Sequence, residues 1–281
     1  MTNPRVRVLL LLMLAACFGI LLIGGRMIHR DKPPIPESVV TGKRQVVFTG
    51  ADVMAGQQHY FSRGGQHIGS IWGHGSYLAP DWSADCLHRT GLYVAARKLG
   101  KNPAQARAFA QADLDALDPV VRATVEAKVV AELKPNRYDA VTGVLTFTPL
   151  QAEAFKALVP YYTGLFRDGN DRMGLQAGIV KDEAEGRAMT SFFAWLAWAA
   201  VTNRPGQAVT YTSNWPFDPL VGNGPLPGTL IWSIASVILL ILAVGLVIFF
   251  YMRYIREDSY EAKPVAALAE PAPTPRQKVT L

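Results

Sequence analysis

The sequence predicts a mainly α-helical domain, with a small β-hairpin inside it, held between two membrane-spanning helices. Two long uncharged runs predict the spans. Repeated helix-start signals between the runs predict the helices. One alternating segment with a central glycine predicts the hairpin. Half of the 281 residues are hydrophobic, and the mean hydropathy of +0.14 is high for a soluble protein because of the two runs.

The two apolar runs set the domain organisation. We assign the spans to residues 8–28 and 230–252 and the domain to residues 29–229. At 1.5 Å per residue the second run exceeds the ~30 Å hydrocarbon core. The first run lacks a clean small-residue cleavage site, which favours an uncleaved anchor over a cleaved signal peptide. A third run, 192–201, is too short to span and predicts a buried core helix.

The flanks of the spans bear on orientation. Basic residues lie on both sides of the first span, so charge alone does not orient it. Long loops cross membranes largely regardless of charge. We therefore expect residues 1–7 and the tail 253–281 in the cytoplasm and the domain on the outer face. The Ala/Pro/Glu-rich tail is expected to be disordered.

Charge and cysteine content exclude several classes of protein. The net charge is +6, but basic residues are scattered among acids with no basic stripe, so no nucleic-acid partner is expected. Cys17 lies in the first span and Cys86 in the domain, so they cannot pair. The sequence has no CxxC or CxxCH, which excludes covalent c-type haem, and no GxSxG, Walker A or HExxH motif.

Local signals place the elements of the domain. Asn102-Pro103 and Asp118-Pro119 each predict an N-cap followed by proline at the first helical position. The two helices that they open are expected to form an antiparallel hairpin. The predicted segments are a strand at 44–49, helices at 51–63, 80–98, 103–117, 119–133, 149–158 and 182–203, a β-hairpin at 138–147 and turns at 160–178.

The densest motif is residues 69–88, rich in glycine, tryptophan and histidine. Such glycines are typical of backbone at positive φ or in close approach to another group. His74 and His88 could bind a metal with Asp81 or Asp85, but HxxxH and HxH spacings are absent. The simpler interpretation is a folded loop entering a helix, with hydrogen-bonded histidines and a solvated acidic helix N-terminus.

Three segments carry a family resemblance. The longest is Gly69-Ser-Ile-Trp-Gly-His-Gly-Ser-Tyr-Leu-Ala-Pro-Asp-Trp-Ser-Ala-Asp-Cys-Leu-His-Arg89, preceded by Gly56-Gln57 and Gly64-Gly65. Thr202-Asn-Arg-Pro205 with Tyr211-Thr-Ser-Asn-Trp-Pro-Phe-Asp-Pro-Leu220, and Pro33-Pro-Ile-Pro-Glu37, follow the same pattern in collinear order. Together they resemble the N-terminal region of quinol-dependent nitric oxide reductases. The family commonly has Trp where Cys86 stands.

The resemblance implies a fold and a place in an enzyme. The fold is a mainly α, cytochrome c-like periplasmic domain without its haem, flanked by two transmembrane helices of the bacterial inner membrane. The resemblance also implies calcium at the contact with the catalytic core, with ligands matching the Gly75 carbonyl and Tyr77. No cofactor is expected to be covalently bound here; haem b, haem b3, non-haem iron and calcium are expected only in the complete enzyme.

The family's catalytic core carries the histidines that bind haem and iron, whereas no histidine follows His88 in this chain. We therefore expect a truncated or split product, inactive alone, whose role is structural. The complete enzyme would convert 2 NO, 2 electrons and 2 protons to N2O and H2O, with the missing core as partner. The alternatives are a periplasmic ligand-binding or sensory module between two membrane helices, and a metal enzyme built on His74 and His88.

Overall fold

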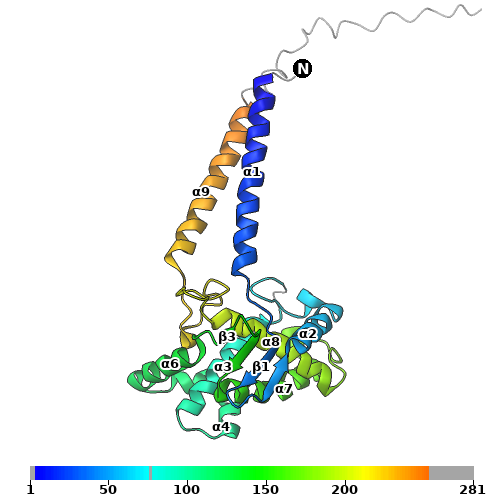
Figure 1. Ribbon diagram of the computed structural model, residues 1–281, viewed down its shortest axis with the longest axis vertical. Helices are drawn as coiled ribbons and strands as arrows, with labels where there is room; N and C mark the ends of the chain where they lie inside the picture. Colours follow the sequence, from blue (N-terminus) through cyan, green and yellow to red (C-terminus); the bar gives the residue numbers. More distant parts are fainter. Residues whose placement is uncertain (1–3, 76–77, 253–281) are drawn as a thin grey trace, which may run out of the picture. The chain divides into compact units, whose positions relative to one another are not determined.

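The computed structural model describes residues 4–75 and 78–252. It divides into two compact units, Met1–Pro225 and Leu226–Leu281. The described part of the second unit consists mainly of one helix, α9 (Pro227–Phe250), while the first unit holds α1 (Pro4–Asp31) and the folded domain (Figure 1). The predicted tail, 253–281, lies outside the described residues.

Two helices are long and apolar enough to cross a membrane. They are Leu11–Asp31, the apolar part of α1, and α9. No residue in either apolar stretch is buried within the protein, which is the pattern expected of helices that face lipid. The helices expected at the two flanks of the domain are therefore present.

The domain contains a four-stranded sheet of β1 (Ser38–Thr41), β2 (Val46–Thr49), β3 (Tyr138–Asp139) and β4 (Val144–Phe147), in the order β2-β1-β4-β3. The predicted hairpin is present as the antiparallel pair β3–β4. The predicted strand at 44–49 is present as β2. Strand β1 was not predicted, because it is short and pairs in parallel with β4, about a hundred residues away in the chain.

Side-chain caps fix most helix starts where the sequence predicts them. The helices that begin at such caps include α2 (Gly50–Ser62), α3 (Trp82–Lys98), α6 (Pro119–Leu133) and α8 (Glu183–Val201). In three of them an aspartate accepts hydrogen bonds from backbone N–H groups of the first turn. These signals are local, so the sequence reports them directly.

The predicted helix at 103–117 is divided. It forms α4 (Pro103–Ala108) and α5 (Gln111–Asp115), separated by Phe109, whose backbone is extended. Phe109 is 7% exposed, so the break between α4 and α5 places its aromatic ring in the core. The predicted antiparallel helix hairpin is not formed as a packed pair, because α4 and α6 each pack against α3 and make no comparable contact with each other.

Helix α7 (Pro149–Asp168) continues through Pro160, so the predicted end near residue 158 is wrong, and the predicted turns begin only after Asp168. Phe155, Val159, Tyr162 and Phe166 form one buried stripe along α7. Pro160 lies on the exposed side of α7, where the hydrogen bond that a proline removes from a helix costs less than it would in the core. Tertiary burial therefore overrides the local signal.

Helix α8 is the centre of the domain, and α2, α3 and α7 pack around it (Figure 1). The predicted core helix at 192–201 is confirmed as its buried second half. Trp195 of α8 donates from Nε1 to the carbonyl of Pro34 at 2.9 Å. Arg204 forms an ion pair with Asp31, the last residue of α1, at 3.2 Å. The end of α1 is thereby bound to the domain.

Candidate functional site

The glycine loop, residues 69–81, connects the 3-10 helix η1 (Gly65–Ile68) to α3. Its residues 76–77 lie outside the described part. Gly69 has φ +139°, and a Cβ added there would lie 2.1 Å from Nε1 of Trp82. The Gly69 carbonyl accepts a hydrogen bond from the buried Tyr60 hydroxyl at 2.8 Å, and Trp82 Nε1 donates to the Ile68 carbonyl at 3.0 Å. Buried side chains therefore fix where the loop begins.

Asp81 closes the glycine loop and caps α3. Its carboxylate accepts hydrogen bonds from Ser70 Oγ at 2.7 Å, from the Gly73 amide at 2.8 Å and from the Ala84 amide at 3.0 Å. The Ser83 hydroxyl also donates to it. The carboxylate therefore accepts four hydrogen bonds, two on each oxygen, and holds the loop closed.

Trp82 lies at the centre of a buried aromatic cluster beneath the glycine loop. Its ring stacks on Phe193 at a centroid distance of 5.7 Å and meets Phe166 edge-on at 4.9 Å. Tyr162 packs against the same rings. Burial raises the pKa of the neighbouring Cys86 thiol to about 12, so the thiol stays protonated. Aromatic packing fills this part of the core.

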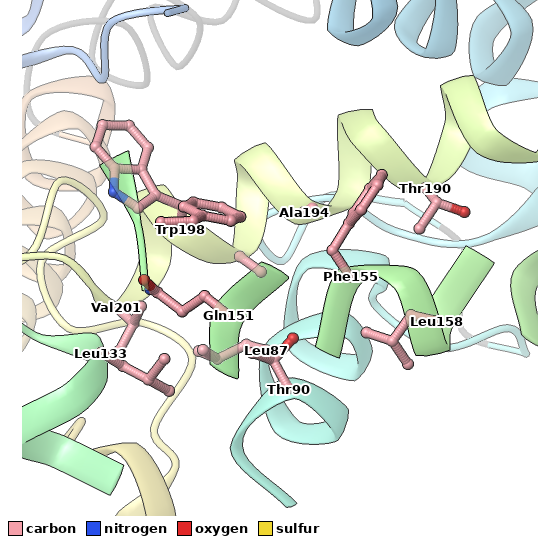
Figure 2. A pocket seen from close by; sticks show the side chains of 12 residues that line it. Leu87, Thr90, Leu133, Gln151, Phe155, Leu158, Thr190, Ala194, Trp198 and Val201 are labelled. Carbon is pink, nitrogen blue, oxygen red and sulfur yellow. The ribbon is translucent and has the colours of Figure 1, made fainter. Parts of the chain in front are cut away.

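A small cavity remains between α3, α7 and α8 (Figure 2). Its volume is about 30 Å³, enough for a water molecule and far too small for a haem macrocycle. Apolar side chains dominate its wall, with Thr90, Gln151 and Thr190 as polar exceptions. The void is a packing defect of the core.

A second loop, the Trp215 loop, comprises residues 202–223. Its conformation is held by its own polar side chains: the Asn214 amide donates to Thr210 Oγ1 at 2.7 Å. Asn223 donates from Nδ2 to the carbonyls of Ala200 at 2.9 Å and Pro216 at 3.0 Å. Lys134, at the end of α6, donates to Asn223 Oδ1. Burial lowers the pKa of Lys134 to about 8.

The two loops meet. A Cβ added at Gly73 would lie 3.3 Å from Cζ2 of Trp215. His88, which follows the glycine loop on α3, forms a hydrogen bond from Nδ1 to Asp218 Oδ2 at 2.9 Å. This hydrogen bond raises the pKa of His88 against the opposing effect of burial. Segments more than a hundred residues apart thus share one surface.

We call this surface the joined surface. It consists of residues 72–75 and 78 of the glycine loop, His88, and residues 215–218 of the Trp215 loop. Two of its apolar side chains are exposed, Leu78 at 77% and Phe217 at 53%. Trp72 is partly buried and packs against Trp195 of α8. The joined surface therefore presents exposed apolar side chains on two loops whose backbones are held by hydrogen bonds and by packing against α8.

The family resemblance implies Gly75 and Tyr77 as calcium ligands. Gly75 is exposed with φ +143°, and a Cβ there would lie 2.8 Å from the Ser70 Cα. The loop's own folding thus accounts for glycine at this position. Tyr77 lies outside the described residues, so the pair stays a prediction. Within residues 4–75 and 78–252 no group of three or more His, Cys, Asp or Glu side chains is placed to hold a metal.

The alternative metal site is not assembled. His74 Nδ1 lies 3.1 Å from the Trp72 carbonyl, and His88 pairs with Asp218. Asp81 already accepts hydrogen bonds from the loop and from α3. Asp85 is not simply solvated, as the sequence suggested: its Oδ2 accepts from Arg89 Nε at 2.9 Å and from the Tyr162 hydroxyl at 2.7 Å. The histidines hydrogen-bond within the protein, as the simpler interpretation holds.

The contacts between Gly73 and Trp215 and between His88 and Asp218 were not predicted. Both join regions far apart in the chain, and no local spacing reports such contacts. The one available signal was that both regions belong to segments with the same family resemblance.

The comparisons with known proteins agree with that resemblance. The family model of the NorB cytochrome c-like domain of nitric oxide reductase matches residues 36–217. The match includes the glycine loop and most of the Trp215 loop. No curated protein matches the chain.

Proposed function

Because the chain belongs to the family of the NorB cytochrome c-like domain of nitric oxide reductase, we propose that it forms the interface portion of a quinol-dependent nitric oxide reductase. In this role the domain covers the outer face of a catalytic core that holds the haems and iron. The core can be on the same polypeptide or on another one. The domain orders the contact and excludes water from it.

The joined surface is the observation that carries this proposal. It brings together the two segments through which the chain most resembles the reductases. A domain that docks a partner needs exposed apolar groups held in fixed positions. Phe217 and Leu78 are such groups, exposed at 53% and 77%. Asp81 and Trp82 hold the glycine loop that carries Leu78, and Asn223 holds the Pro216 carbonyl next to Phe217.

The core of the domain supports a structural role. Trp82, Phe166 and Phe193 fill the space beneath the glycine loop, and the cavity beside them has a volume of about 30 Å³. The sequence has no CxxCH attachment motif. The chain's own contribution to the reaction of 2 NO, 2 electrons and 2 protons to N2O and H2O is therefore docking and packing, while the core's haems and iron supply the redox chemistry.

A calcium ion at the docked interface would take one oxygen from the Gly75 carbonyl and one from Tyr77. Calcium prefers six to eight oxygen ligands, so the partner would supply the remaining ones. Gly75 is exposed on the joined surface, which is compatible with this arrangement. Calcium-dependent association of the chain with the core would support it, and association unaffected by a calcium chelator would contradict it.

The two apolar helices, with the family membership, indicate a membrane-associated protein. We propose that the domain, residues 29–229, lies on the periplasmic side of a bacterial inner membrane, with both termini in the cytoplasm. A V141C variant tests this, since Val141 is 96% exposed. A membrane-impermeant maleimide should label V141C in intact spheroplasts; labelling only after lysis would contradict the orientation.

Quinol-driven NO consumption tests the proposed function. The full chain is co-expressed with the catalytic core of such a reductase, and activity is compared with that of the core alone. We expect the chain to raise activity and Phe217→Asp to reduce the gain. Val141→Asp, an exposed position at the β3–β4 turn, is the matched control and should keep the gain. Activity indifferent to the presence of the chain would refute the role.

A further inference from the structure

A second, larger pocket lies between α3, α4 and α7, away from the residues of the joined surface. We call it the Arg89 pocket. Its volume is about 210 Å³, larger than the engineered apolar cavities of about 150 Å³ that take up benzene. One aromatic ring with a small substituent therefore fits. Its lining includes Arg89, Leu92, Arg107, Phe109, Ala157 and Tyr161.

The pocket has an apolar floor and an exposed rim. Leu92 and Phe109 are each 7% exposed, whereas Arg107 and Pro160 at the rim are exposed. Phe109 reaches the floor because the chain is extended between α4 and α5. The break that divides the predicted helix at 103–117 is thus also what builds the floor of the pocket.

The charges at the pocket are positive. Arg89 is held by a hydrogen bond from Nε to Asp85 Oδ2 at 2.9 Å, and its guanidinium carbon lies 4.0 Å from the centroid of the Tyr161 ring. These two contacts fix the orientation of the Arg89 guanidinium, which lines the pocket. Arg107 is exposed at the rim, and the carboxylates of Asp85 and Glu153 pair with Arg89 and Arg97 rather than with it. Lys101 lies over the Phe109 ring at 5.5 Å, which adds a third cation nearby.

Of the two carboxylates near the pocket, Asp85 offsets the charge of Arg89 through their ion pair, so the charge that stays uncompensated among the described residues of the lining is that of Arg107 at the rim. Asp85 is bound by Arg89 and the Tyr162 hydroxyl, and Glu153 is paired with Arg97 at 3.0 Å. Neither acid lines the pocket. A ligand with one negative charge would therefore meet the exposed guanidinium of Arg107 at the rim and the fixed guanidinium of Arg89.

We propose that the Arg89 pocket binds a small organic carboxylate with a single-ring or similarly short apolar body. Arginine is suited to carboxylates because its planar fork donates two parallel hydrogen bonds. The ring would pack on Phe109 and Leu92, where aromatic contact favours a flat body. This site goes beyond the proposed interface function and shares no residue with the joined surface, so either proposal can fail without the other.

Titration of the full chain in detergent with benzoate tests the proposal. Benzyl alcohol, a neutral analogue of similar shape, is the comparison ligand, and saturation-transfer NMR with calorimetry reports binding. We expect saturable binding of benzoate, weakened by salt, with benzyl alcohol at least about tenfold weaker because it lacks the charge. Equal binding of the two probes, or no binding of benzoate, would overturn the proposal.

Three variants locate the site. Arg107→Gln should weaken benzoate about tenfold, and Ala157→Leu should abolish binding by filling the pocket. Arg172→Gln, an exposed arginine outside the pocket, should bind as the wild type does. Thermal unfolding by circular dichroism establishes that each variant is folded. If Ala157→Leu does not fold, the comparison of benzoate affinity between Arg107→Gln and Arg172→Gln tests the site. Unchanged affinity in Arg107→Gln would refute the site.

Discussion

The glycine loop and the Trp215 loop form one surface but are held in different ways. The glycine loop is held from beneath, by the buried Tyr60 hydroxyl, the Trp82 indole and the Asp81 carboxylate. The Trp215 loop is held largely by polar side chains of its own, chiefly Asn214 and Asn223. The position of the first loop therefore depends on side chains of the core and on the α3 cap. The position of the second depends on the hydrogen bonds of its own asparagines and on Leu220 and Val221, which are buried in the core.

This difference shows how the two halves of the joined surface can be perturbed separately. A change in the aromatic core should displace the glycine loop and reduce global stability together. A change in the hydrogen bonds of the Trp215 loop should loosen that loop at a smaller cost in stability. The expected effects therefore decrease from the aromatic core, through the loop hydrogen bonds, to the single pair of side chains at the surface.

Trp82→Ala should have the largest effect. It removes a fully buried ring from the aromatic cluster together with the hydrogen bond to the Ile68 carbonyl. Replacement of a buried tryptophan by alanine costs about 3–5 kcal/mol. Denaturant unfolding of the purified chain measures the loss. Phe217→Ala, at an exposed position, should change stability by less than about 0.5 kcal/mol; equal losses in both would show that the core does not support the loop.

Gly69→Ala should cost about 2–4 kcal/mol, because the added Cβ would lie 2.1 Å from Trp82 Nε1 in addition to the strain of a positive φ. Gly100→Ala is the matched control. Its φ is also positive, +81°, but nothing lies within 4 Å of the added Cβ, so we expect about 1–2 kcal/mol. Thermal unfolding of the two variants side by side gives the difference. Equal losses would mean that the close approach to Trp82 does not matter.

Asp81→Ala should cost about 2–3 kcal/mol, since it removes the α3 N-cap and leaves donors at Ser70 and Gly73 without their acceptor. Asp81→Asn keeps one acceptor oxygen and should lose less. Hydrogen exchange should rise at the Gly73 and Ala84 amides in Asp81→Ala. An unchanged exchange rate at the Gly73 amide would show that the Asp81 carboxylate does not hold the glycine loop.

Asn223→Ala should lower the free energy of unfolding by about 1–2 kcal/mol and should loosen the Trp215 loop. It removes the hydrogen bonds to the Ala200 and Pro216 carbonyls and the acceptor of Lys134. Hydrogen exchange should rise in residues 210–223 and stay unchanged at the Gly73 amide. A rise of equal size at Gly73 would show that the two loops are not independently held.

The pair of His88 and Asp218 should give the smallest effect. The pKa of His88 is raised above its ordinary value of 6.5, chiefly by the hydrogen bond to Asp218. Its stabilisation is therefore fully present below pH 6.5 and is lost as the pH rises through the folded-state pKa. The side chain is 36% exposed, so solvent screening limits the effect to about 0.5 kcal/mol. The stability of His88→Gln relative to the wild type, measured at pH 5.5 and pH 8.5, checks this; a larger difference at pH 8.5 would contradict it.

Local chemistry explains which parts of the fold were predictable. The starts of α3, α6 and α8 follow from capping aspartates that act within three residues of themselves. The apolar helices follow from composition. The positive φ values at Gly69, Gly73 and Gly75 follow from the glycines themselves, whereas the positive φ of Trp72, +48°, does not. In each case the determining groups are adjacent in the sequence.

The sequence predictions that failed have one cause in common. Helix α7 continues through Pro160 because burial of Tyr162 and Phe166 stabilises it, and strand β1 exists because β4 lies beside it. The pairing of His88 with Asp218 and the charge of the Arg89 pocket likewise depend on contacts between distant segments. The residues of the site were visible in the sequence, but their partners were not.

Site-specific photo-crosslinking tests most directly whether the joined surface docks on a reductase core. A benzoylphenylalanine is placed at Phe217 of the full chain, and at Val141 as the control, because both side chains are exposed and only Phe217 belongs to the joined surface. The chain is co-expressed with the catalytic core and irradiated in membranes. We expect a crosslink to the core from position 217 and none from position 141. Absence of a crosslink from 217, or equal crosslinks from both positions, would contradict docking through the joined surface.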